Sequence, residues 1–190
     1  MGNSIPYAWY ITRSSALVAF FLLYSSIFLG LAIQTPFFRK IINPAHSFRI
    51  HCWISLQALV FAAIHGITLL FDDTISFRLE DIFIPFASPF SPNLVALGIV
   101  GFYAMIILTV TSYFKEYISH RLWRITHSLN IILYLAILVH ALFLGTDMKI
   151  TIVRNAFILF NVFLTLFMLY NLIWRSANYF KNKKNNENLR

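Results

Sequence analysis

Charged residues are scarce in this 190-residue chain: Asp, Glu, Lys and Arg make up only 12% of it, whereas 59% of its residues are hydrophobic. A typical soluble domain is about a quarter charged and about half apolar. The six glycines form no glycine-rich phosphate-binding loop. The single cysteine, Cys52, excludes an internal disulfide, and we interpret it as a small buried hydrophobe. We therefore expect an integral membrane protein.

Five apolar runs are long enough to cross a membrane, which takes about 20 residues for a hydrocarbon core of roughly 30 Å. We place these runs at about residues 13–35, 50–71, 93–114, 124–145 and 152–174. They predict an all-α integral membrane protein, a bundle of about five transmembrane helices. We expect an external segment at 1–12, one membrane domain at 13–175 and a basic, disordered cytoplasmic tail at 176–190.

Lys and Arg are distributed unequally between the two sides of the predicted bundle. The side with the first-to-second loop, the third-to-fourth loop and the C-terminus holds eleven of them, and the other side holds four. Cytoplasmic loops carry the excess of positive charge. We therefore predict an external N-terminus and a cytoplasmic C-terminus, and we expect a cell inner or plasma membrane, of bacterial type, as the location.

The seven acidic residues all lie outside the predicted spans, and five of them fall on the predicted outer side. The net charge of +8 then serves as an orientation signal, and we expect the lipid bilayer rather than nucleic acid as the partner of this chain. The acidic, proline-rich stretch 72–92 is expected to cap the outer end of the bundle at the membrane interface.

Two apolar spans each carry two histidines, and ionisable groups inside a membrane are costly and indicate function. His51 and His65 are 14 residues apart, which gives roughly 21 Å of rise and places both on one face of a helix. His127 and His140 are 13 residues apart. Because that spacing is about 140° short of four turns, a straight helix does not put both on one face. A local kink, or ligands that approach from different edges, would account for it.

The second and fourth spans run in the same direction, so His51 matches His127 in height on the inner side and His65 matches His140 on the outer side. Our leading hypothesis is that the two pairs clamp two stacked haems and pass electrons across the membrane. A metal or proton transporter that uses these histidines is the alternative, although transporters usually place acids or broken helices at the membrane centre. A structural subunit with hydrogen-bonded histidines is the third interpretation.

Three arginines lie near the predicted histidine sites. Arg121 and Arg124 precede His127 and either follow the positive-inside rule or pair with the carboxylates of a haem bound there. Arg13 opens the first span and either snorkels to the headgroups or meets an anion.

The arrangement resembles the ferric reductase-like transmembrane domain that is shared by ferric reductases, NADPH oxidases and the haem-binding subunit of the bacterial methionine sulfoxide reductase system. The resemblance extends from Arg13 to about Trp174. It is carried by the His51–His65 pair, which ends in AAIHG, and by the His127–His140 pair within RLWRITHSLNIILYLAILVH. The unusual 13-residue spacing is the one this family uses.

The resemblance implies two b-type haems that carry electrons from the cytoplasmic to the outer face, with His51 and His127 as inner ligands and His65 and His140 as outer ligands. It also implies that Arg13 meets the outer haem propionates. Bis-histidine ligation suits electron transfer rather than oxygen binding at iron.

The larger relatives continue into a flavin and nicotinamide domain, which this sequence lacks after its last span. We therefore expect a haem-containing oxidoreductase component that uses FAD or FMN and NAD(P)H only through a separate partner. The expected donor is a cytosolic flavin reductase or a quinone. The expected acceptor is ferric iron, oxygen or a periplasmic reductase.

Overall fold

The computed structural model describes the backbone of residues 7–72 and 75–188, and side chains as far as Lys181. Every element in these ranges is helical. The α-helices are α1 Tyr7–Gln34, α2 Pro36–Arg39, α3 Pro44–Thr68, α4 Leu79–Phe83, α5 Pro92–Tyr113, α6 His120–Ser128, α7 Asn130–Leu144 and α8 Thr151–Asn188. The 3-10 helices are η1 Leu69–Phe71, η2 Lys115–Tyr117 and η3 Thr146–Lys149.

Five stretches of this chain are long and apolar enough to span a membrane: Tyr7–Gln34, Pro44–Phe71, Pro92–Tyr113, His120–Leu144 and Thr151–Lys181. Each overlaps one of the five predicted spans, so the prediction of an all-helical integral membrane protein is confirmed. The first two begin about six residues before the predicted starts. In α3 the reason is local: Pro44 occupies the first turn, and the Asn43 side chain caps it by accepting bonds from the backbone nitrogens of Ala45 and His46 at 3.0 and 3.3 Å.

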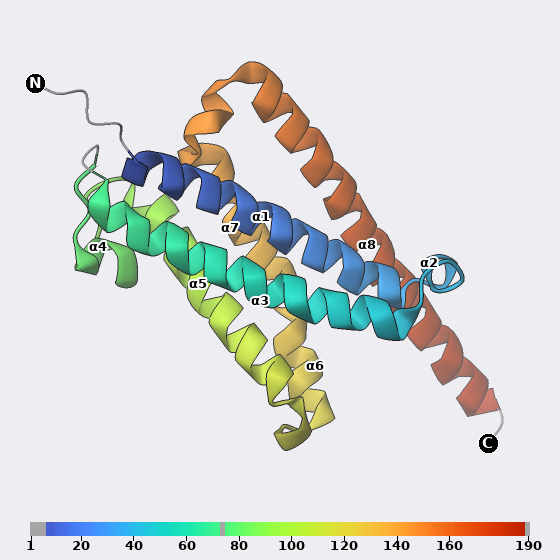
Figure 1. Cartoon of the computed structure of the whole chain (residues 1–190). Coiled ribbons are helices and arrows are strands. Elements are labelled where there is room, and N and C mark those ends of the chain that lie inside the picture. Colours follow the sequence, from blue (N-terminus) through green and yellow to red (C-terminus); the bar gives the residue numbers. More distant parts are fainter. Residues whose placement is uncertain (1–6, 73–74, 189–190) are drawn as a thin grey trace, which may run out of the picture.

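The helices form two closely packed pairs (Figure 1). Helix α1 packs along α3, and α5 packs along α7, while α8 contacts both α1 and α7. Within the described residues, α3 does not pack closely against α6 or α7. The two pairs meet instead through α3 with α5 and through α1 with α7. The two histidine-bearing spans are therefore neighbours across the bundle without close packing of their backbones.

Loops alternate between the two ends of the bundle. The start of α1, α4 and the α7–α8 turn lie at one end, and α2, the α5–α6 turn and the end of α8 lie at the other (Figure 1). The count of Lys and Arg on the two sides of the bundle was based on this same grouping of loops.

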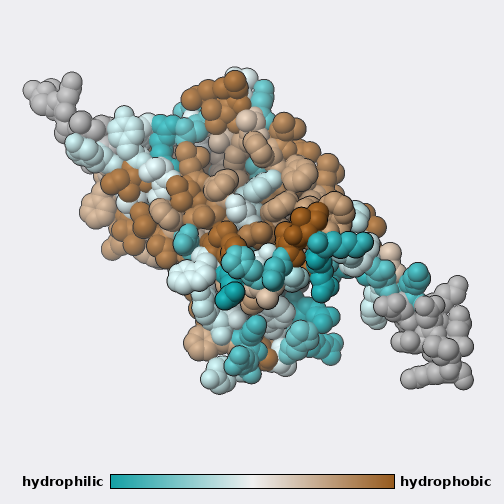
Figure 2. Space-filling view, turned by 45° about the vertical axis from the view of Figure 1, so that its right-hand side comes forward, coloured by the Kyte–Doolittle hydropathy of each residue, from teal (hydrophilic) through white to brown (hydrophobic). Residues whose placement is uncertain are grey.

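A small core of apolar residues lies where α1, α3, α5, α7 and α8 meet. Its members are Leu23, Ile27, Ala58, Met105, Leu108, Leu133, Tyr134, Leu164 and Met168. Many other large apolar side chains are exposed, including Phe21 at 67%, Trp53 at 63% and Phe160 at 65%. Figure 2 shows this apolar surface over the middle of the visible face, with hydrophilic residues gathered toward its lower end. Such a surface suits contact with lipid.

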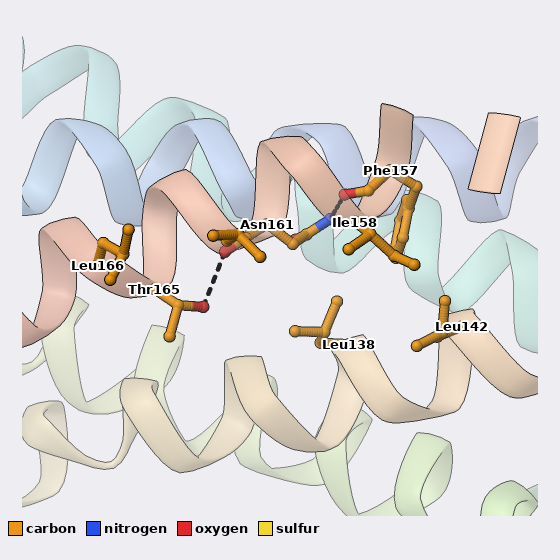
Figure 3. A pocket seen from close by; sticks show the side chains of 8 residues that line it. Leu138, Leu142, Phe157, Ile158, Asn161, Thr165 and Leu166 are labelled. Carbon is orange, nitrogen blue, oxygen red and sulfur yellow. Dashed lines mark hydrogen bonds between the residues drawn. The ribbon is translucent and has the colours of Figure 1, made fainter. Parts of the chain in front are cut away.

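Buried polar side chains attach α8 to the rest of the bundle. Asn161 accepts a hydrogen bond from the hydroxyl of Tyr134, a residue with no exposed surface. Asn171 accepts one from Thr35 at 2.9 Å. A groove of about 210 Å³ runs between α7 and α8 beside Asn161 and Thr165, and none of the four candidate histidines lines it (Figure 3).

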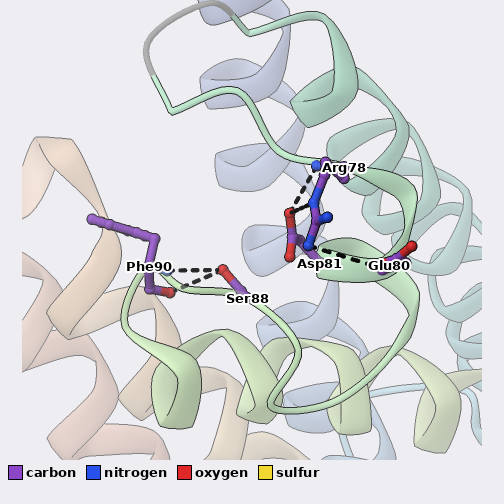
Figure 4. Close-up of polar contacts among 5 residues, drawn as sticks. All are labelled: Arg78, Glu80, Asp81, Ser88 and Phe90. Carbon is purple, nitrogen blue, oxygen red and sulfur yellow. Dashed lines mark hydrogen bonds and ion pairs between the residues drawn. The ribbon is translucent and has the colours of Figure 1, made fainter.

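The stretch expected to cap the outer end folds around short polar contacts. The backbone nitrogen of Arg78 donates to Asp81 at 2.9 Å, and its guanidinium contacts Glu80 at 3.4 Å (Figure 4). The hydroxyl of Ser88 donates to the carbonyl of Phe90 at 3.1 Å. Phe86 nearby is 66% exposed, as expected of an interfacial segment.

The C-terminal segment differs from its predicted disorder. Helix α8 continues past the apolar span as far as Asn188. Once a helix is nucleated, each added residue gains one backbone hydrogen bond. Polar residues with low helix propensity can therefore continue the helix beyond the apolar span.

Candidate functional site of paired histidines

The four candidate histidines lie on two spans and form two pairs at different heights. His51 and His65 are both on α3, His127 is on α6, and His140 is on α7. The imidazoles of His51 and His127 face each other with ring centroids 6.2 Å apart and planes at 75°. Those of His65 and His140 are close enough to interact electrostatically. These neighbours agree with the pairing by height expected from the sequence, and the binding of one haem by each pair stays a prediction.

The separation of the first pair has a chemical meaning. Two imidazoles on opposite sides of one metal ion, with metal–nitrogen bonds of about 2 Å, have ring centroids about 6 Å apart. The observed 6.2 Å is therefore compatible with a single metal centre between His51 and His127.

Both histidines of α3 are oriented by α1. The Nδ1 atom of His51 lies 2.8 Å from the backbone carbonyl of Ser26 and 3.0 Å from its hydroxyl. The Nδ1 atom of His65 lies 3.1 Å from the carbonyl of Thr12. A neutral imidazole that donates from Nδ1 to a carbonyl keeps the lone pair of Nε2 for a metal.

Helix α5 orients the other two histidines in the same way. The Nδ1 atom of His140 lies 2.8 Å from the carbonyl of Leu94, and the Nδ1 atom of His127 lies 3.4 Å from the hydroxyl of Ser112. In the part of the chain that the structure describes, no hydrogen bond involves the Nε2 atom of any of the four. Each pair thus offers two free Nε2 atoms, the donor set of a bis-histidine haem, and the residues present fit that group.

A break in the helix lies between the two histidines of the fourth span. Helix α6 ends at Ser128 and α7 begins at Asn130, with Leu129 between them. The Leu129 nitrogen bonds to the carbonyl of Thr126, three residues back, and the side chain of Asn130 donates to the carbonyl of His127 at 2.9 Å. A turn of this tighter type adds about 20° per residue to the rotation of an α-helix, so it makes up part of the shortfall of about 140° between His127 and His140. The break agrees in kind with the local kink expected from the sequence, and the approach of ligands from different edges stays the other account.

Glycines make room for two of the imidazoles. A Cβ atom on Gly98 would lie 2.6 Å from Cε1 and 2.8 Å from Nδ1 of His140, well inside ordinary contact distance. A Cβ on Gly30 would lie 3.3 Å from Cε1 of His51. The absence of a side chain at Gly98 therefore leaves room for the ring of a candidate ligand.

Two of the three candidate arginines have partners within the protein. Arg13 forms a two-point ion pair with Asp147 of η3, with its Nε 3.1 Å from one carboxylate oxygen. Its guanidinium also lies 4.2 Å from the centre of the Trp9 ring. Arg124 bonds through a terminal nitrogen to Nε2 of His120 at 2.8 Å. Arg121 is exposed. Contact of these three with haem carboxylates stays a prediction.

Reasoning from the sequence missed the residues that orient the imidazoles. The hydroxyls of Ser26 and Ser112 carry no signal in the sequence that separates them from other small polar residues of the spans. The carbonyls of Thr12 and Leu94 are backbone groups, which sequence cannot single out. Over residues 7–72 and 75–188, no group of three or more His, Cys, Asp or Glu is placed to hold a metal ion.

Comparison with known proteins gives one match. The family described as ferric reductase like transmembrane component matches residues 15–138, which include His51, His65 and His127. Arg13 and His140 lie just outside that range. No curated protein and no solved structure matches the chain. Because the match covers well over half of the sequence, the chain belongs to the ferric reductase-like transmembrane component family.

Proposed function

We propose that this protein passes electrons across a membrane through two b-type haems, each held by one histidine of α3 and one of α6–α7. Membership of the family indicates transmembrane electron transfer in general. The observation that carries the finer proposal is the orientation of the four imidazoles: each Nδ1 is bonded to a neighbouring helix, and each Nε2 is free.

The residues of the chain do the positioning. His51 and His127 would hold the inner haem, and His65 and His140 the outer one, with α1 and α5 fixing the ring orientations. Haem, when bound, supplies one-electron exchange between the ferric and ferrous states of its iron. Two histidines per iron leave no open position, so the chain favours electron transfer over oxygen binding at the metal.

The direction of transfer follows from charge. The sequence assigns eleven Lys and Arg to the first-to-second loop, the third-to-fourth loop and the C-terminal segment, and this side is proposed to face the cytoplasm of a bacterial-type cell. A membrane potential that is negative inside favours outward electron movement by about 2.3 kcal/mol per electron per 100 mV. A cytosolic flavin reductase or a quinone is proposed as donor, and ferric iron, oxygen or a periplasmic reductase as acceptor.

An absorption spectrum of the detergent-purified, haem-replete protein tests this proposal. The oxidised and dithionite-reduced forms are compared, and haem is quantified per chain. We expect two haems with low-spin b-type bands. His65→Ala and His140→Ala should each reduce the content toward one haem.

His46→Ala is the matched control, because His46 is exposed at the start of α3 and should leave both haems in place. A colourless protein from haem-replete cells would contradict the proposal, and so would a haem content that the control lowers as much as His65→Ala does.

A further inference from the structure

Trp123 on α6 has a buried hydrogen-bond donor with no acceptor. Its Nε1 atom is shielded from solvent and, among the described residues, has no hydrogen-bond partner. Leaving a buried donor unpaired costs about 1–3 kcal/mol. Because tryptophan can only donate, whatever satisfies this group must be an acceptor.

The ring of Trp123 is held against a candidate ligand. The centroid of the Trp123 ring lies 5.0 Å from that of the His127 ring, and the two planes are inclined at 19°. On the other side in sequence, the His120 ring stacks on Trp123 with centroids 5.9 Å apart and planes at 27°. A metal–nitrogen bond lies in the plane of its imidazole. A ring stacked on that imidazole is displaced sideways from the metal–nitrogen bond, so Trp123 would lie over the outer part of a macrocycle held by His127 rather than over its metal.

The rim of a b-type haem carries two propionate carboxylates, which are strong hydrogen-bond acceptors. Trp123 also lies between Arg121 and Arg124, whose positive charges favour an anion at this end of the span. The indole N–H of Trp123 is therefore an unpaired donor at the end of the span where the sequence gathers positive charge.

We infer that Trp123 is a positioning residue whose indole N–H donates a hydrogen bond to a propionate of the haem held by His127. The inference rests on the proposed function and adds to it a residue that the histidine pattern does not reveal. A donor to the propionate offsets part of its negative charge. Removing the donor leaves more uncompensated negative charge near the iron, which favours the ferric state.

The test is a redox titration of the haem-loaded protein carrying Trp123→Phe, which keeps an aromatic ring and removes the N–H. We expect two haems per chain, as in the unaltered protein, and a lower midpoint potential for one of them. The same substitution in a His65→Ala background identifies the affected haem as the inner one. Trp53→Phe is the matched control, because Trp53 is 63% exposed on α3 and should leave both potentials unchanged.

Loading the protein with a second haem compound distinguishes an effect of the lost hydrogen bond from an effect of the altered ring stacking. Haem dimethyl ester has no free carboxylates, so Trp123→Phe should shift the potential with haem and not with the ester. An equal shift with both, or no shift with either, overturns the inference. Replacement of Trp123 by 3-benzothienylalanine, which preserves ring size and lacks the N–H, should give the same result if the phenylalanine variant does not fold. Absence of haem would contradict the proposed function, whereas two haems with unchanged potentials would contradict this inference alone.

Discussion

The imidazoles of His51 and His127 come from different spans, face each other at 6.2 Å between centroids, and are each bonded through Nδ1 to the helix behind them. These Nδ1 bonds link α3 to α1 and α6 to α5, so each also joins two helices. The second nitrogen of each ring, Nε2, has no hydrogen bond among the described residues and stays free for a metal. This is how proteins prepare imidazoles for a metal.

The imidazoles of the two inner histidines differ in the number of hydrogen bonds that orient them. Substitution of the serine beside each should therefore affect haem binding to a different extent. Among the described residues, the only hydrogen bond to the imidazole of His127 involves the Ser112 side chain at 3.4 Å, whereas that of His51 also has the Ser26 carbonyl at 2.8 Å. Ser112→Ala should weaken binding of the inner haem by about tenfold, the low end of the range for such orienting groups. Ser26→Ala should weaken it less. Haem titration of the apoprotein measures both, and a greater loss in Ser26→Ala would contradict the assignment.

Gly98 gives a second prediction. In Gly98→Ala the new methyl group would lie within 3.1 Å of three ring atoms of His140, so either the imidazole or α5 must shift. Overpacking of this kind costs about 1–3 kcal/mol. We expect loss of the outer haem with the inner haem kept, measured as haem per chain.

Gly66→Ala is its control, because the nearest atom to a Cβ there belongs to Ile82 at an ordinary 3.7 Å. Equal haem loss in both variants would show that disturbed helix packing, and not displacement of the His140 imidazole, causes the haem loss in Gly98→Ala.

Sequence alone predicted the five spans, because they follow from the length of apolar runs. The matched heights of the histidines follow from helix rise, and their role as haem ligands stays a prediction. The sequence did not place the break at Leu129, since nothing in LNIIL marks a turn: the sequence there has neither glycine nor proline.

Polar pairs between residues far apart in the sequence could not be predicted from the sequence either. Arg13 and Asp147 are 134 residues apart, and only the folded bundle brings the start of α1 to the turn after α7. The sequence also does not reveal that the Nε1 atom of Trp123 is buried without an acceptor among the described residues, since this depends on the folded surroundings.

The buried pair of Tyr134 and Asn161 predicts a non-additive effect on stability. Tyr134→Phe leaves the Asn161 oxygen without its donor from α7, at a cost of about 1–3 kcal/mol. In the double variant Tyr134→Phe with Asn161→Leu, both polar groups are gone, and the loss should be smaller than the sum of the two single losses. Thermal unfolding in detergent measures this. Additive losses would contradict a direct bond between the two side chains.

The pairing of histidines across the bundle is the central claim, and haem counts in double variants test it most directly. His51→Ala with His127→Ala removes both ligands of one haem, so we predict that this variant keeps one haem per chain. His51→Ala with His140→Ala removes one ligand from each pair, and we predict that it keeps neither. Equal haem content in the two double variants would contradict the pairing.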